Sequence, residues 1–182
     1  PEFTGDLSFL AGEGPLTYIT MGSSGNPKVI EKLVPILESL GSRIIITTAG
    51  KPLSFIPKLP TTRLFDYLPG SAVCQKASLV ICNGGSPTTN QALCCGVPVL
   101  GIAQNMDQLL NMEAIANYGA GIVIRADRLA RATLRQAIES LVTDRKYTNR
   151  AQHLARNQGL ESRPSTLSGH ILDQYTKRKF TS

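Results

Sequence analysis

The sequence predicts an α/β fold: a doubly wound, Rossmann-like parallel sheet of about six strands, with helices on both faces and a helical C-terminal tail. Two observations predict this class. Short apolar runs alternate along the chain with segments of helical periodicity. The apolar runs are continuous rather than interrupted at every second residue, which is typical of parallel strands buried on both faces. A chain of 182 residues can bury such a core without a disulfide or a metal.

The first strand and the first helix are expected to flank a turn. The strand is predicted at 16–21, where LTYITM is apolar and β-rich and precedes the turn sequence GSSGNP. A helix is predicted over 27–40 because its apolar residues recur at helical spacing. Pro27 suits the first turn of this helix and Gly41 suits its end, while Pro35 is expected to kink it.

The remaining elements continue the alternation. A loop is expected at 51–61, which contains three prolines and shows no periodicity. Further strands are expected at 43–50, 62–68, 78–82, 97–102 and 121–124. Helices are expected over about 71–77, from Ser86 to Gly96, from Met106 to Gly119, and from Leu129 onward.

The charge and hydropathy of the chain indicate which kinds of partner it is expected to bind. The net charge is +6, and much of the excess lies late in the chain. The basic residues are dispersed along helical stretches with few aromatics, so a solvated helical face is favoured over a nucleic-acid surface. No apolar run approaches the roughly 20 residues of a membrane helix, and no signal-type leader is recognised. We therefore expect no nucleic-acid partner, no stable membrane insertion and a cytoplasmic location.

The four cysteines match no zinc or disulfide spacing. Cysteines without a disulfide pattern are typical of proteins in a reducing compartment. Cys94 and Cys95 lie in an apolar helical stretch and are expected to be small core residues. The sequence contains no His/Cys cluster and no paired metal-binding aspartates, so neither a metal nor a cofactor is expected.

The loop after the fourth strand has the features of an anion site. In CNGGSPTTNQ the strand ends at Cys82, and two glycines allow the backbone to turn and a ligand to approach closely. Ser86 is expected to cap the next helix, with Pro87 in its first position. The free amides of Ser86, Thr88 and Thr89 would then point outward at the positive end of this helix, where a phosphate fits. The alternative is a plain glycine-rich turn, and this loop alone does not decide between them.

Three other loops are expected at the same carboxyl edge of the sheet. MGSSGNP follows the first strand with a second Ser/Gly turn, Tyr67 after the third strand can stack on a flat base, and Asp107 with Gln108 offers acceptors for vicinal hydroxyls. Each has an ordinary structural alternative: a turn, a rim residue or a helix start. Together they describe a nucleotide-sugar site. His153 and His170 lie in the basic helical tail and are expected to be surface residues rather than catalysts.

The segment NGGSPTTNQALCCGVPVLGIAQNMDQLLNMEAIANYGAGIVI resembles the donor-binding signature of GT-B glycosyltransferases, in particular the UDP-glycosyltransferase and macrolide glycosyltransferase group. The family pattern is His-Gly-Gly-x-Gly-Thr-x-x-Glu-x-Leu-x-x-Gly-Val-Pro, followed by Asp-Gln-x-x-Asn. The resemblance implies that the two Ser/Gly loops hold a diphosphate, that Tyr67 stacks on the base, that Gln91 binds the ribose, and that Asp107 and Gln108 bind the sugar. The donor-binding residues implied are Gly22, Ser23, Ser24, Tyr67, Leu68, Asn83, Gly84, Gly85, Ser86, Thr88, Gln91, Asp107 and Gln108.

This sequence departs from the family pattern at four positions. Asn83 replaces the histidine, so that contact to the phosphate carries no positive charge. Pro87 replaces the last glycine of the Gly-Gly-x-Gly segment, and Gln91 replaces the glutamate. Gly70 stands where the family often has a glutamine. These departures bear on the donor and on catalysis, not on the fold.

The resemblance covers only one half of a GT-B enzyme. Such enzymes have two Rossmann-like domains, and the amino-terminal one binds the acceptor and supplies the base, so no catalytic residue is expected in this chain. Residues 15–160 are interpreted as the nucleotide-sugar-binding domain, 161–182 as a helical tail, and 1–14 as a tag, leader or linker. An excised half is favoured over a natural subunit.

The implied function is transfer of a hexosyl group from a UDP- or dTDP-sugar to a hydroxylated small molecule or lipid. The alternatives are a nucleotide-sugar epimerase and a catalytically dead sugar-nucleotide-binding module. The isolated chain is expected to self-associate through the apolar cleft face that the missing acceptor domain would cover.

Overall fold

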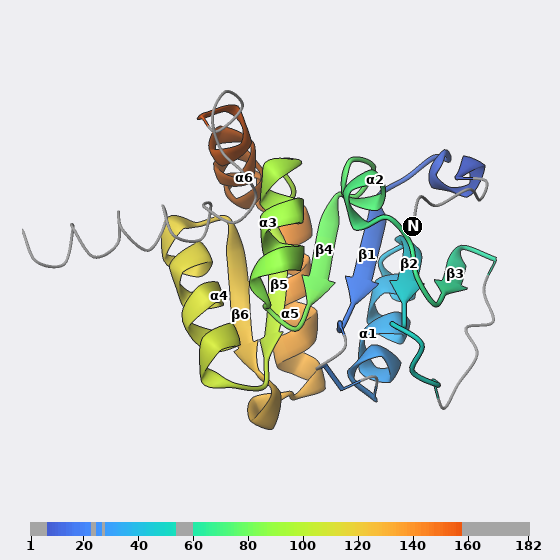
Figure 1. The fold of residues 1–182 in the computed structure, drawn as a ribbon, viewed down its shortest axis with the longest axis horizontal. Helices are drawn as coiled ribbons and strands as arrows, with labels where there is room; N and C mark the ends of the chain where they lie inside the picture. The colour runs from blue at the N-terminus through green and yellow to red at the C-terminus, as the bar shows by residue number, and fades with distance from the viewer. Residues whose placement is uncertain (1–6, 23–24, 27, 54–59, 158–182) are drawn as a thin grey trace, which may run out of the picture.

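The structure, a computed structural model, describes residues 7–22, 25–26, 28–53 and 60–157. It contains a six-stranded sheet in the order β3-β2-β1-β4-β5-β6, and each pair of neighbouring strands is parallel (Figure 1). This confirms the doubly wound, Rossmann-like sheet. The strands are β1 (Leu16–Thr20), β2 (Arg43–Thr47), β3 (Thr62–Phe65), β4 (Leu79–Cys82), β5 (Val99–Ala103) and β6 (Gly121–Arg125).

Helices cover both faces of the sheet. One face packs against α1 (Lys28–Ser39) and α5 (Arg131–Thr143), which lie behind the strands in Figure 1. The other face packs against α2 (Gly70–Cys74), α3 (Ser86–Cys94) and α4 (Met106–Tyr118), and α6 (Arg145–Asn157) contributes to the same core. Two short 3-10 turns, η1 (Ser8–Leu10) and η2 (Ala126–Arg128), complete the described elements.

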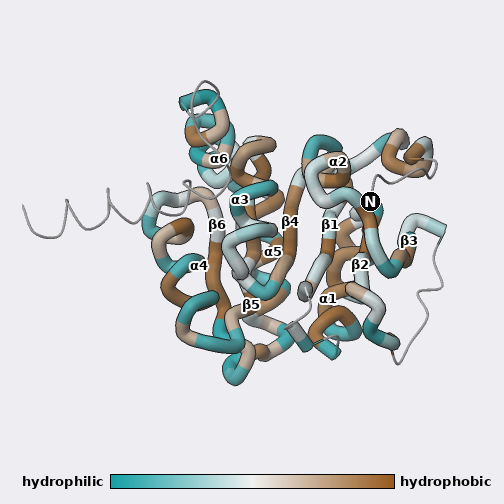
Figure 2. The backbone as a smooth tube through the Cα atoms, viewed as in Figure 1, coloured by the Kyte–Doolittle hydropathy of each residue, from teal (hydrophilic) through white to brown (hydrophobic). Residues whose placement is uncertain are grey.

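Burial on two faces explains the continuous apolar runs. In β2, Ile44 and Ile46 belong to the core under α1 and α5, whereas Ile45 belongs to the core under α2, α3 and α4. Successive side chains of a strand point to opposite faces, so a strand covered on both sides needs apolar residues at every position. Figure 2 shows the resulting hydrophobic colour along the central strands, with hydrophilic residues on the outer helix surfaces.

Glycines end three of the long helices, as the sequence predicts. Gly41, Gly96 and Gly119 all have a positive φ, which L side chains rarely adopt. After α1, the Gly41 N–H donates to Glu38 O and the Ser42 N–H donates to Leu37 O. The same two bonds recur after α3 and α4. This Schellman arrangement satisfies carbonyls that would otherwise lack a donor at the helix end.

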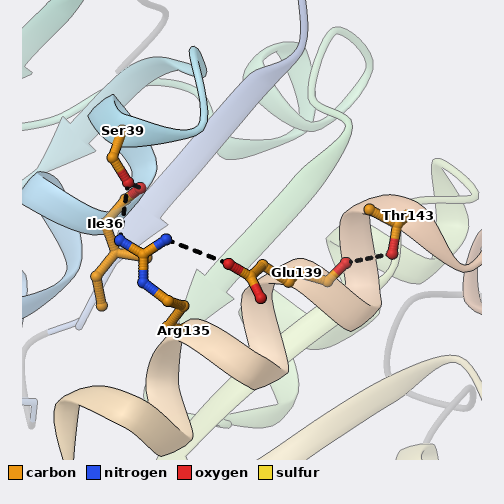
Figure 3. A network of polar contacts seen from close by, with 5 residues as sticks. All are labelled: Ile36, Ser39, Arg135, Glu139 and Thr143. Atoms are coloured by element: carbon orange, nitrogen blue, oxygen red, sulfur yellow. Dashed lines mark hydrogen bonds and ion pairs between the residues drawn. The ribbon is translucent and has the colours of Figure 1, made fainter.

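A polar network joins the two helices on the rear face (Figure 3). The Arg135 guanidinium of α5 donates to Glu139 Oε1 at 3.2 Å and to Ser39 Oγ of α1 at 3.1 Å. Ser39 in turn donates to Ile36 O at 2.7 Å. The Arg135 and Glu139 side chains are 40% and 45% exposed, so their ion pair contributes little to stability.

The edge of the sheet differs from the sequence prediction. β3 ends at Phe65 rather than at residue 68, and α2 covers 70–74 rather than 71–77. β3 is an edge strand. Asp66 follows it, and its carbonyl accepts from the Ala49 N–H at 3.0 Å while its carboxylate accepts from the Thr48 hydroxyl at 2.9 Å. α1 runs through Pro35, while Pro27 and the predicted tail 161–182 lie outside the described residues.

The prediction that Cys94 is a core residue is wrong. α3 buries Ala92 and Leu93 against the sheet and α6, which leaves Cys94 exposed and Cys95 half-buried. Cys74 and Cys82 are the two buried thiols. Burial raises the pKa of each of these two thiols to about 12, so both stay neutral at ordinary pH.

The described part of the N-terminal segment packs on the sheet. Leu10 is buried, and the Phe9 ring stacks on Phe65 with 4.6 Å between ring centroids. His153 is exposed on α6 and hydrogen-bonds Tyr118 Oη at 2.9 Å, which fits a surface histidine; His170 lies outside the described residues. Within the described ranges, no helix combines the length and apolar character needed to cross a membrane.

Candidate functional site

The strand order reverses between β1 and β4, and their loops form the centre of the candidate site. Thr20 and Cys82, the last residues of the two strands, are register partners. The chain leaves β1 toward one edge of the sheet and leaves β4 toward the other. Beyond this point Gly22 lies against Asn83, since a Cβ built on Gly22 would be 3.5 Å from Asn83 Nδ2. Such a switch point is where open α/β sheets bind ligands.

The glycine loop after β4 packs against α4 and contains two hydrogen bonds of its own. Gly84 has φ +86, and a Cβ there would lie 2.7 Å from Met112 Cγ and 3.2 Å from Gln108 O, so only glycine fits without a shift of α4. The Gly84 N–H donates to Cys82 Sγ at 3.3 Å, and the Gly85 N–H donates to Asn83 Oδ1 at 3.1 Å. The amides of both glycines therefore have hydrogen-bond partners within the loop.

The start of α3 corrects two details of the prediction. Gly85, not Ser86, is the N-cap residue, and no side chain caps this end. The Thr89 N–H donates to Gly85 O at 3.2 Å, so it is not one of the free amides. The N–H groups of Ser86 and Thr88 have no partner in the described part of the chain, and Pro87 has no N–H. These two amides form the positive end of the helix and can receive an anion.

Asn111 of α4 is a residue of the site that the sequence analysis did not single out. It is buried, and its Nδ2 donates to Gly84 O at 2.8 Å and to Thr89 Oγ1 at 3.0 Å. Its Oδ1 is buried without a hydrogen-bond partner. One side chain thus joins the glycine loop, α3 and α4. The signal was present in the sequence, because Asn111 is the asparagine of the Asp-Gln-x-x-Asn pattern.

Asp107 and Gln108 at the start of α4 have different environments. Asn105 caps this helix and accepts from the Gln108 N–H at 2.9 Å. The Gln108 side chain is buried, and its Oε1 accepts from the Gln104 N–H at 2.8 Å. Asp107 is exposed in the first turn. Of the two residues predicted to bind a sugar, Asp107 presents its side chain to solvent and Gln108 uses its oxygen to hold the helix start.

The rim of the site lies toward β3. Tyr67 is 70% exposed, and its hydroxyl would be 3.3 Å from a Cβ on Gly50, which follows β2. The Gln91 side chain of α3 lies against Gly70 at the start of α2, where a larger residue would collide with it. Leu68 is half-buried and packs on the core, so its side chain faces inward. Ser23 and Ser24 lie outside the described residues.

The sequence matches one family model over residues 31–173, described as the C-terminal domain of erythromycin biosynthesis protein CIII-like proteins. A PGL/p-HBAD biosynthesis glycosyltransferase of Mycobacterium tuberculosis is 38% identical over 151 residues, which are 82% of this chain and 35% of that protein. A PGL/p-HBAD biosynthesis rhamnosyltransferase of Mycobacterium bovis is 39% identical over 147 residues, which are 80% of this chain and 32% of that protein. The chain thus spans about a third of the length of these relatives.

Solved structures share the fold. The glycosyltransferase VinC in complex with dTDP superposes with a TM-score of 0.76 at 20% identity, over 95% of this chain and 44% of that chain. The spinosyn rhamnosyltransferase SpnG gives a TM-score of 0.71 at 22% identity, over 87% of this chain and 45% of that chain. In both cases this chain corresponds to one half of a two-domain fold. The chain therefore belongs to the erythromycin biosynthesis protein CIII-like C-terminal domain family, the carboxyl-terminal half of GT-B glycosyltransferases.

Proposed function

We propose that this chain binds the nucleotide diphosphate of a sugar donor, UDP- or dTDP-linked, for a glycosyltransferase that transfers a hexosyl group to a hydroxylated small molecule or lipid. The observation that carries the proposal is the pair of unpartnered amides at Ser86 and Thr88, located where the strand order reverses. Backbone amides at a helix start stabilise the negative charge of a leaving diphosphate without moving during the reaction.

We assign roles to the other predicted residues according to their positions along the carboxyl edge of the sheet. Tyr67 at the rim would stack on the base, and Gln91 against α2 would bind the ribose. Thr88, half-buried in the first turn of α3, would add a hydroxyl to the two amides. Asp107 would accept hydrogen bonds from the sugar hydroxyls. Ser23 and Ser24 remain proposed diphosphate contacts from the loop after β1.

The relatives favour sugar transfer over epimerisation, because they are named as glycosyltransferases and rhamnosyltransferases. dTDP is the nucleotide to test first, since it is bound in the VinC structure. The acceptor and the catalytic base would come from a second domain. Tyr67, Met106 and Leu110, which are 70%, 61% and 51% exposed, would be covered by that domain, and the isolated chain would self-associate through them.

Calorimetric titration tests the diphosphate site. dTDP and UDP should bind, and the bare nucleosides should bind much more weakly, because only the phosphates use the helix amides. Thr88→Val keeps the shape and removes the hydroxyl. A charge-assisted hydrogen bond contributes about 1.5–3 kcal/mol, so the affinity for dTDP should fall about tenfold or more. Thr133→Val, at an exposed position on α5, is the matched control and should bind as the wild type does.

Two results would argue against the proposal. Equal affinities for dTDP and thymidine would show that the helix start does not bind phosphate. Unchanged dTDP affinity in Thr88→Val would remove that hydroxyl from the site. On the full-length protein, donor and acceptor assays separate the alternatives: transferred sugar supports the proposal, an epimerised donor supports an epimerase, and an unchanged bound ligand supports a binding module.

A further inference from the structure

A second group of polar side chains lies at the opposite, amino-terminal edge of the sheet. Arg43 begins β2, and Arg63 is the second residue of β3. Arg63 is the register partner of Ile45. Side chains two positions apart on a strand share a face, so Arg43, Ile45 and Arg63 lie on the same face. Two guanidinium groups are therefore held near each other, far from the loops of the donor site.

Both arginines line one pocket of about 210 Å³. Phe9 and Ala11 of the N-terminal segment also line it, as does Thr61, which immediately precedes β3. The Phe9 ring is fixed by stacking on Phe65. A buried water needs only about 10–15 Å³ of such volume, so the pocket has room for a small polyatomic ion. None of the described residues that line it is acidic.

Among the described residues, Arg43 has no carboxylate partner. Its Nη2 donates to Leu10 O at 3.1 Å, while its Nε is buried and finds no hydrogen-bond partner in the described part of the chain. The guanidinium also packs against Gly12, where any Cβ would collide with it. Neither Arg43 nor the exposed Arg63 pairs with a carboxylate among the described residues. A partly desolvated cation without an anion is unfavourable, and a bound anion would relieve that cost.

We propose that this pocket binds a phosphate-class oxyanion, either inorganic phosphate or the phosphate group of a small metabolite. Planar guanidinium groups match phosphate oxygens with parallel hydrogen bonds, and both Arg43 and Arg63 line this pocket. The hydroxyl of Thr61 lines the same space and can donate as well. The site is separate from the donor site and does not depend on the proposed transferase function.

The test is calorimetric titration of the whole chain with sodium phosphate at constant ionic strength, with saturating dTDP present throughout. Arg63→Gln is the first variant, because Arg63 is exposed and its loss should not disturb folding. Arg145→Gln, at another exposed arginine on α6, is the matched control. We expect saturable phosphate binding in the wild type and the control, and a loss of about tenfold or more in Arg63→Gln. Arg43→Lys keeps the charge but not the fork and should also bind more weakly.

Glycerol 3-phosphate in place of phosphate distinguishes the two sources: tighter binding of the ester points to a metabolite, and tighter binding of phosphate points to the free ion. The proposal is overturned if neither compound binds saturably in the presence of dTDP. It is also overturned if Arg63→Gln binds phosphate as the wild type does, or if Arg145→Gln loses as much affinity as Arg63→Gln.

Discussion

At the scale of single residues, Asn111 is the side chain on which the shape of the glycine loop depends most. It supplies hydrogen bonds to both Gly84 O and Thr89 Oγ1. Asn111→Ala should lower the free energy of unfolding by about 1–3 kcal/mol, because buried polar atoms lose their donor. Its dTDP affinity should fall as well, since the loop loses its fixed position. Urea unfolding and calorimetry measure the two effects.

The control for this variant lies on the same helix. Asn117 is exposed on α4, so Asn117→Ala should change stability by no more than about 0.5 kcal/mol and leave dTDP affinity unchanged. Thr89→Ser keeps the hydroxyl that accepts from Asn111 and should retain most of the affinity. If Asn111→Ala is destabilised but binds dTDP with the affinity of the wild type, Asn111 has a structural role only.

The buried thiols give a pH dependence of defined sign. Burial raises the pKa of Cys74 to about 12, whereas a thiol in the unfolded chain titrates near 8.5. Above this lower value the unfolded chain loses the proton and the folded chain keeps it, so the free energy of unfolding should fall as pH rises from about 8.5 toward 12. Each such thiol contributes at most about 1.4 kcal/mol per pH unit.

Urea unfolding between pH 7.5 and pH 10 measures this slope. Cys74→Ala removes one titrating group and should flatten the decline relative to the wild type. Cys94→Ala, at the exposed cysteine, should leave most of the slope in place. If the free energy of unfolding falls equally with pH in the wild type and in Cys74→Ala, Cys74 does not titrate in this way.

At the scale of helices and strands, the glycine helix ends provide a matched pair. Gly41 and Gly96 both have φ +71, but an added Cβ would meet nothing within 4 Å at Gly41, whereas at Gly96 it would lie 3.2 Å from Gln152 Cα of α6. Gly41→Ala should therefore cost only the strained backbone, about 1 kcal/mol. Gly96→Ala should cost about 1–3 kcal/mol more, because α6 must move. If urea unfolding gives the same decrease in the free energy of unfolding for both variants, α6 can move aside without a measurable cost.

The elements also show what the sequence could and could not predict. Continuous apolar runs and glycine stops located the strands and helices well, because burial and backbone conformation are local requirements. The sequence predicts the end of β3 three residues too late, at residue 68 instead of Phe65, because the apolar run LFDYL does not mark where an edge strand leaves its neighbour. Serine is a common N-cap residue, so the sequence predicts Ser86 as the cap of α3. In the structure Gly85 has the extended backbone of the N-cap position and Ser86 is the first helical residue. Asn111 was missed because a polar residue inside a helix ordinarily faces solvent.

At the scale of the whole molecule, the chain resembles one half of a two-domain enzyme. We expect it to fold and bind dTDP but not to transfer sugar, because we propose that the acceptor site and the base belong to a second domain. A radiolabelled donor assay with and without acceptor measures this, and the full-length protein under the same conditions is the positive control. Transfer by this chain alone at an ordinary enzymatic rate would contradict the half-enzyme interpretation.

The adjacency of β1 and β4 also has a kinetic consequence. Two helices and two further strands come between them along the chain, so Thr20 and Cys82 meet only after a long loop of polypeptide has closed. Pairings between distant segments form slowly. We therefore expect the proposed nucleotide site to form only after both halves of the sheet have docked. The recovery of dTDP binding after dilution from urea would then report the time of this late folding step.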